Sequence, residues 1–246
     1  MNFKFKAAVG GALILMMSSQ YASAAIALDR TRVIFNGSDK SLALNIENKN
    51  KELPYLAQAW LENEKGEKIT SPFAILPPIQ RVEPGAKSQI KLQGLPALKS
   101  EPQDRESVYY FNLREIPPRS DKPNTLQIAL QTRIKLFYRP SGIAVKTSDK
   151  PWQEKITLSN QNGKYVVNNP TPYFVTLVGA KKSASGTVLS NFTPLMVPPK
   201  GQAELSVSAS ALGSSPVLTY VNDYGGRPDL TFSCNGSTCN VASATK

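Results

Sequence analysis

The sequence predicts an all-β protein made of two β-sandwich domains, and three observations support this. From Ala25 onward, short runs rich in β-branched and aromatic residues alternate with turn signals, as in residues 41–47, where Leu42, Leu44 and Ile46 recur at period two. No segment has the pattern of a helix of about 12 residues or more. The remaining length suits two sandwiches of about 100 residues each.

Composition excludes much of the familiar enzyme repertoire. The chain has 246 residues, of which 41% are hydrophobic and 19% charged, so a core can form. It contains no histidine, which excludes imidazole bases and zinc sites with a histidine ligand, and two cysteines cannot build a four-cysteine cluster. We therefore expect no catalytic residues, no metal and no cofactor. The net charge is +11, but lysine and arginine are spread along the chain, so we expect no nucleic-acid partner.

The N-terminus has the pattern of a secretory signal peptide over residues 1–24. Lys4 and Lys6 precede an apolar stretch, residues 7–17, and Ala22-Ser23-Ala24 matches an A-x-A cleavage site. The apolar stretch is shorter than the roughly 20 residues that span a bilayer, and no later stretch is long enough. The mature protein is therefore expected to begin at Ala25, outside the cytoplasm and without a membrane span.

Export changes how the two cysteines are interpreted. Cys234 and Cys239 flank a short segment containing Asn235-Gly236, a tight-turn signal. Exported proteins meet oxidising conditions, so the pair is predicted to form a disulfide across a β-hairpin. A redox pair is the weaker interpretation, because the spacing is not C-x-x-C and no helix start follows.

A stretch bearing proline, glycine and lysine, residues 139–151, separates two sets of predicted strands. The second set begins near Trp152. We therefore predict an N-terminal domain over residues 25–143 and a C-terminal domain over residues 144–246.

The strongest local pattern is an alternation over residues 126–138. Every second residue from Leu126 to Tyr138 is apolar or threonine, and the positions between are mostly polar. Thirteen residues exceed the usual strand of about five or six. One interpretation is the core face of a long strand. The other is that part of the strand overhangs its own domain, where an apolar edge would be a template for another chain.

The chain resembles the periplasmic pilus-assembly chaperones over essentially its whole mature length. The segments that carry the resemblance occur in order through both halves: residues 28–32 (Leu-Asp-Arg-Thr-Arg), 55–60 (Tyr-Leu-Ala-Gln-Ala-Trp), 103–107 (Gln-Asp-Arg-Glu-Ser), 111–118 (Phe-Asn-Leu-Arg-Glu-Ile-Pro-Pro), 126–140, 169–173 (Asn-Pro-Thr-Pro-Tyr) and 222–228 (Asn-Asp-Tyr-Gly-Gly-Arg-Pro). The resemblance implies two immunoglobulin-like domains with a cleft between them. It also implies residence in the periplasm of a Gram-negative bacterium.

The resemblance further implies a function without catalysis. Family members bind pilus subunits by donor-strand complementation and deliver them to an outer-membrane usher. By position, Leu126, Ile128 and Leu130 would enter the subunit, and the short loop over residues 117–124 is like that of chaperones serving rod-type pili. Arg32 and Lys135 would bind the subunit's terminal carboxylate. Strict alternation places Lys135 on the face opposite Leu126, so we expect a twist or bulge to re-aim part of the strand.

The resemblance also assigns a set of interdomain ion pairs to Glu106, Arg139 and Asp223. Considered alone, each would be interpreted as a surface charge.

Two other classes of protein fit the sequence less well. A structural pilus subunit or two-domain adhesin would carry an alternating N-terminal extension and lack its own last strand, whereas here the last strand of the N-terminal domain is present. A hydrolase without histidine would need a Ser–Lys or carboxylate pair, and no supporting spacing occurs. The sequence names neither the client subunits nor the usher. It also leaves open whether the free chain self-associates through its donor segment.

Overall fold

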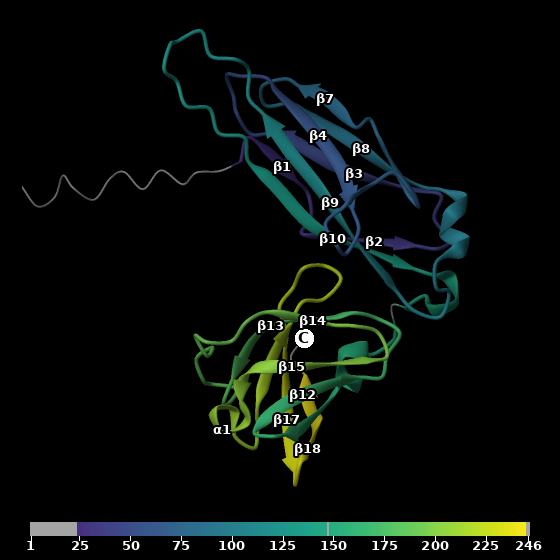
Figure 1. The fold of residues 1–246 in the computed structure, drawn as a ribbon, viewed down its shortest axis with the longest axis vertical. Helices are drawn as coiled ribbons and strands as arrows, with labels where there is room; N and C mark the ends of the chain where they lie inside the picture. The colour runs from purple at the N-terminus through teal and green to yellow at the C-terminus, as the bar shows by residue number, and fades with distance from the viewer. Residues whose placement is uncertain (1–23, 147, 245–246) are drawn as a thin grey trace, which may run out of the picture.

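The computed structural model describes residues 24–146 and 148–244, arranged as two β-rich bodies joined near residues 140–155 (Figure 1). The expected signal peptide, apart from Ala24, lies outside these residues. None of the helices in the described part of the chain is long and apolar enough to cross a membrane.

The N-terminal body is built from two sheets. One has the strand order β1-β3-β8-β6, and the other has the order β2-β10-β9-β4-β5, with β7 also paired to β4. The strands are β1 (Ile26–Leu28), β2 (Arg32–Asn36), β3 (Ser41–Asn48), β4 (Tyr55–Glu62), β5 (Lys68–Ile69), β6 (Phe73–Leu76), β7 (Ile79–Val82), β8 (Lys87–Gly94), β9 (Ser107–Ile116) and β10 (Gln131–Arg139).

The core of this body lies between the two sheets and follows the period-two alternation of its strands. Ala57, Ala59 and Leu61 of β4 face inward, and so do the alternate residues of the neighbouring strands. Phe35 and Phe73 meet edge to face with ring centroids 5.0 Å apart. Each large apolar side chain fully buried here contributes about 1.5–3 kcal/mol.

The C-terminal body is one continuous ladder of eight strands in the order β14-β13-β16-β17-β18-β11-β12-β15. Its core is a second, separate cluster that includes Leu177, Leu205 and Phe232. A single helical turn, α1 (Ala209–Leu212), follows β15 and is capped by the hydroxyl of Ser208. The strands are β11 (Thr157–Gln161), β12 (Lys164–Asn169), β13 (Val175–Lys181), β14 (Leu195–Val197), β15 (Gly201–Ser208), β16 (Val217–Tyr220), β17 (Asp229–Asn235) and β18 (Thr238–Ala244). The two-sandwich, all-β prediction is confirmed.

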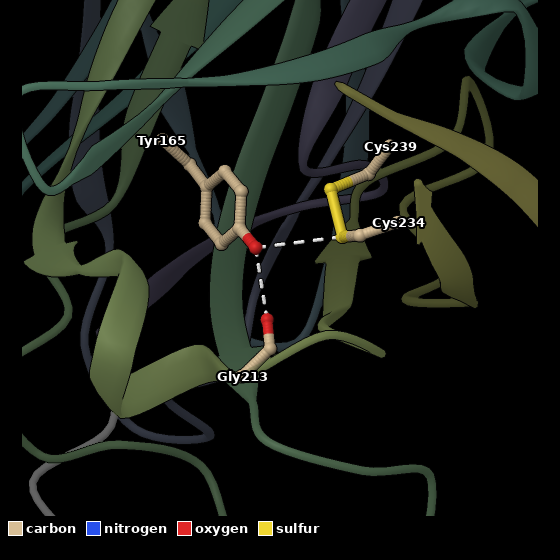
Figure 2. Close-up of a disulfide and its surroundings, with 4 residues drawn as sticks. All are labelled: Tyr165, Gly213, Cys234 and Cys239. Carbon is tan, nitrogen blue, oxygen red and sulfur yellow. Dashed lines mark hydrogen bonds between the residues drawn. A yellow bond between two sulfur atoms is a disulfide. The ribbon is translucent and has the colours of Figure 1, made fainter. Parts of the chain in front are cut away.

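The predicted disulfide is formed. Cys234 and Cys239 are register partners in the hairpin of β17 and β18, with their Cα atoms 3.8 Å apart. The hydroxyl of Tyr165 donates a hydrogen bond to the carbonyl oxygen of Gly213 at 2.9 Å and lies 3.4 Å from Sγ of Cys234 (Figure 2). The disulfide therefore closes the tip of the β17–β18 hairpin. It lies beside Tyr165, whose hydrogen bond connects β12 to the end of α1.

The long strand predicted over residues 126–138 is only partly present. β10 begins at Gln131, and residues 125–130 precede it without regular secondary structure. They belong to the extended teal loop that projects from the N-terminal body in Figure 1. The prediction of one thirteen-residue strand is therefore wrong for its first five residues, because β9, the only strand paired with the start of β10 in the described structure, ends at Ile116 and its last partner in β10 is Gln131.

Candidate functional site

Arg32 and Lys135 lie side by side in the second sheet. They are register partners in the parallel ladder between β2 and β10, although 103 residues separate them in sequence. One Nη of Arg32 donates to the carbonyl oxygen of Val221 in the C-terminal body at 3.1 Å. Nε of Arg32 is buried and has no hydrogen-bond partner. Within residues 24–146 and 148–244, no ion pair includes Arg32 or Lys135.

Both cations are half-buried, and this costs free energy. Burial lowers the pKa of the Arg32 guanidinium, and the nearby carboxylates of Asp223 and Glu106 only partly oppose it. Burial also lowers the pKa of Lys135, and the positive charge of Arg32 lowers it further. Two adjacent, partly desolvated positive charges with an unsatisfied N–H are an environment that an anion would stabilise.

The face on which Lys135 lies follows from simple alternation. The ladder between β10 and β9 runs without a register shift from Gln131 to Tyr138. Ile134, Leu136 and Tyr138 therefore enter the core of the N-terminal body. The odd positions lie on the other face, where Phe137 packs against Phe174 of the C-terminal body at 5.6 Å between ring centroids. Of the expected twist or bulge, the bulge is absent from β10, because the side of the sheet turned toward the second body is already the side that carries Lys135.

Leu126, Ile128 and Leu130 do not belong to the core of this chain. These residues are 85%, 64% and 38% exposed. Two hydrogen bonds connect the segment to the end of β9 and the residues after it: the Glu115 amide donates to the carbonyl oxygen of Leu130 at 3.0 Å, and the side-chain amide of Gln127 donates to the carbonyl oxygen of Pro118. Exposure of three large apolar side chains at alternate positions removes the core interpretation for these residues and leaves an unpartnered apolar edge.

The start of β10 also has an unpaired edge. β2 pairs with β10 only from Lys135 to Arg139, so in the described structure Gln131–Ile134 have β9 on one side and no strand on the other. Arg32 and Lys135 therefore lie where this free edge ends. The exposed apolar residues lie where it begins.

Arg139, at the end of β10, connects the two bodies. Its Nε donates to Oε1 of Glu106 at 2.8 Å, and its two Nη atoms donate to the carboxylate of Asp223 at 2.8 and 3.2 Å. Glu106 in turn accepts the amide N–H of Phe174 at 2.8 Å. Burial raises the pKa of Glu106 to about 7, against the opposing effect of Arg139 and the Phe174 amide. The structure thus brings together all three residues of the predicted interdomain set.

Sequence reasoning missed the aromatic surroundings of Arg139. Its guanidinium lies 5.0 Å from the ring centroid of Trp152 and 5.1 Å from that of Tyr173. The Tyr173 hydroxyl donates to the carbonyl oxygen of Ile143 at 2.7 Å, which ties the linker to the C-terminal body. The motif at residues 169–173 contained Tyr173, but nothing in its spacing indicated a cation partner.

Comparison with known proteins agrees with this geometry. The family model described as pili and flagellar-assembly chaperone, PapD N-terminal domain, matches residues 25–144. The model described as pili assembly chaperone PapD, C-terminal domain, matches residues 151–232. Together they cover most of the chain, and the chain belongs to the pilus-assembly chaperone family.

Individual relatives are similar over nearly their whole length. The chaperone protein PapD of Escherichia coli is 53% identical over 221 residues, covering 89% of this chain and 91% of that protein. The probable fimbrial chaperone YfcS of Escherichia coli K12 is 51% identical over 230 residues, covering 94% and 91%. Among solved structures, the CupB2 chaperone of Pseudomonas aeruginosa superimposes with a TM-score of 0.70 at 30% identity, covering 85% of this chain and all of that one.

Proposed function

We propose that this chain binds pilus subunits in the periplasm of a Gram-negative bacterium by donating residues 126–130 as a strand, and delivers them to an outer-membrane usher. The single observation that carries the proposal is the spatial order along β10: an exposed apolar segment, a free strand edge and two cations that form no ion pair within the described part of the chain. Each matches one need of a β-sandwich that lacks its last strand.

An incomplete sandwich exposes a groove of core side chains and two rows of unpaired backbone groups. A strand laid into the groove satisfies both at once. Leu126, Ile128 and Leu130 alternate at period two, so they would all enter the groove, while the backbone between them pairs with the subunit strands on either side. Residues 126–130 form no strand in the free chain, so fixing them as one in the complex costs some conformational entropy.

The anchor gives the complex its register. A terminal carboxylate bound by Arg32 and Lys135 gains charge-assisted hydrogen bonds in a partly desolvated place and removes the repulsion between the two cations. Because a shift of one residue would turn every side chain to the wrong face, a fixed end point selects the pairing in which the apolar residues enter the groove.

Arg139 fixes how the two bodies lie around Arg32 and Lys135. Its ion pairs with Glu106 and Asp223 hold the 222–226 turn of the C-terminal body against the N-terminal body, where Val221 contacts Arg32. We assign the network a positioning role.

The exposed apolar segment also gives the free chain a means of self-association, which sedimentation velocity measures.

The test uses the subunit that co-purifies with the chain from periplasm and a synthetic peptide of that subunit's C-terminal residues. The free-acid peptide should bind, and the same peptide with a C-terminal amide should bind at least about tenfold more weakly, because the amide lacks the charge that the two cations compensate. Equal affinity of the two peptides would contradict the anchor assignment.

A second experiment tests whether the chain donates a strand that keeps the subunit soluble. Mixing the refolding subunit with the chain should give a soluble one-to-one complex, and leaving the chain out should give aggregates. Aggregation in both cases would contradict the proposed function, and so would polymerisation of the chain alone, which is the behaviour of a structural subunit.

A further inference from the structure

The outer face of the second sheet carries a continuous arrangement of cations over aromatic rings. We define the basic–aromatic strip as Trp60, Lys68, Tyr110, Arg114 and Arg133, with Glu62 as its acid. The guanidinium of Arg133 lies 3.5 Å from the ring centroid of Tyr110. Arg114 and Lys68 lie 5.0 and 4.6 Å from the ring centroid of Trp60.

Strand register places these residues in rows that begin at the anchor. Lys135 is paired with Tyr110 of β9, which is paired with Glu62 of β4. The next row away from the C-terminal body is Arg133, Asn112 and Trp60, and the row after that contains Gln131 and Arg114. The strip therefore starts beside Lys135 and runs along β10 toward the exposed apolar segment.

The strip is held in place before anything binds to it. Glu62 accepts hydrogen bonds from Nε1 of Trp60 and from Nε of Arg133, both at 2.9 Å. Gln131 accepts from Arg114 and donates to Asn112, again at 2.9 Å in each case. Burial acts to raise the pKa of Glu62, but these hydrogen bonds outweigh it and hold the pKa below its ordinary value. The one acid of the strip is thus already occupied, and the cations remain in excess.

The side chains nevertheless stay open to solvent. The Arg133 side chain is 40% exposed, and both Lys68 and Gln131 are exposed. Long cationic side chains held over aromatic rings lose less freedom on binding than free ones, and arginine and aromatic residues are enriched where interfaces gain most affinity.

We infer that the strip binds acidic side chains of the same pilus subunit that occupies the anchor, and that it contributes to the choice of client. This rests on the proposed function. The occupant follows from continuity, because a subunit strand paired with the free edge of β10 ends at Arg32 and Lys135 and lies beside Arg133. It follows also from charge, since a second copy of this chain would bring the same cations to the face.

The test compares two double variants that remove the same charge from exposed positions of the N-terminal body. Arg114→Ala/Arg133→Ala alters the strip, and Lys87→Ala/Lys91→Ala alters the outer face of the other sheet. Association with the whole co-purified subunit is measured by stopped flow at low and at physiological salt. The strip variant should associate about tenfold or more slowly at low salt, with a weaker salt dependence, and the control variant should be close to the wild type. Arg133→Lys should recover part of the rate, because it keeps the charge but not the planar contact.

A second measurement separates this inference from the proposed function. A C-terminal peptide whose Asp and Glu residues are replaced by Asn and Gln reaches the anchor without the acidic side chains that the strip would bind, so the strip variant should bind it with unchanged affinity. Failure of the wild-type chain to bind the peptide would count against the anchor alone. Unchanged association of the strip variant with the whole subunit would overturn the inference. Equal slowing of association by both double variants would also overturn the inference. The same holds if the strip variant loses binding to an anionic oligonucleotide or vesicle while its association with the subunit is unchanged.

Discussion

Arg32 lies directly beside Lys135 across the parallel ladder of β2 and β10, and its charge adds to burial in lowering the pKa of Lys135. Placing two like charges together in a half-buried position is unfavourable for the free chain. A bound anion would offset this cost, as the proposed anchor role requires.

Removal of one anchor cation should weaken subunit binding without lowering the stability of the free chain. Lys135→Ala is expected to leave the thermal stability of the free chain unchanged or slightly higher, because a partly desolvated charge is removed. Subunit affinity should fall by about 2–5 kcal/mol, since the carboxylate is left half-paired. Differential scanning fluorimetry and gel filtration with the subunit measure the two effects. A folded Lys135→Ala chain with normal affinity would exclude Lys135 from the anchor.

Affinity for the C-terminal peptide should depend on pH in the alkaline range. The pKa of Lys135 in the free chain is below that of an ordinary lysine, so the side chain loses its proton earlier as pH rises. A bound carboxylate favours the charged form, so affinity falls as pH rises through the lowered pKa. The stability of the free chain should change in the opposite direction, because in that window the unfolded chain binds more protons than the folded one. Calorimetric titration of wild type and Lys135→Arg tests this, and an identical pH profile for the two proteins would refute it.

The same substitution at two positions of the alternating pattern, one in the donor segment and one in β10, compares an exposed residue with a buried one. Ile128→Asp is expected to leave the melting temperature of the free chain nearly unchanged and to abolish the subunit complex, because it would bury a carboxylate in the subunit. Ile134→Asp lies at the same parity six residues later, where the side chain is in the core, and it should unfold the N-terminal body. Thermal unfolding beside a subunit pull-down compares them. A large loss of stability in free Ile128→Asp would return the segment to the core of this chain.

Arg139→Ala should be strongly destabilising, by about 3–5 kcal/mol, because it leaves the buried carboxylate of Glu106 without its cation. Burial already raises the pKa of Glu106, and loss of Arg139 should raise it further. A raised pKa in the folded state means that stability is lost as pH rises, so the penalty should be smaller at pH 5 than at pH 8. Urea unfolding at both values measures it, with Arg139→Ala/Glu106→Gln as the control expected to regain much of the loss. If the loss of stability caused by Arg139→Ala is the same at both pH values, Glu106 does not become an uncompensated charge in the variant.

The disulfide should be complete in periplasmic protein, with no free thiols detected by quantitative labelling under denaturing conditions without reductant. Cys234→Ala/Cys239→Ala is expected to lower the free energy of unfolding by about 2 kcal/mol, since the closed loop is short. Denaturant titration of the variant measures this. Two free thiols in most wild-type molecules would contradict the assignment.

Local pattern in the sequence was sufficient for the features that depend on neighbouring residues. Period-two alternation identified the strands, the two cysteines indicated the hairpin disulfide, and the alternation from Leu126 onward indicated either a core face or a donor segment. Resemblance then pointed to Arg32, Lys135 and the ion-pair set of Arg139. Alternation alone could not choose between core and overhang, because it states which side chains share a face and not what covers that face.

Tertiary structure decided the rest, because it brings together residues that are distant along the chain. Pairing of β2 with β10 begins at Lys135, which frees one edge from Gln131 to Ile134, and pairing of β9 with β10 ends at Gln131, which leaves Ile128 beyond the sheet. The same sheet places Arg133 over Tyr110 and the second body places Trp152 and Tyr173 around Arg139. No local pattern encodes these contacts, since each depends on which strand lies beside which once the two cores have formed.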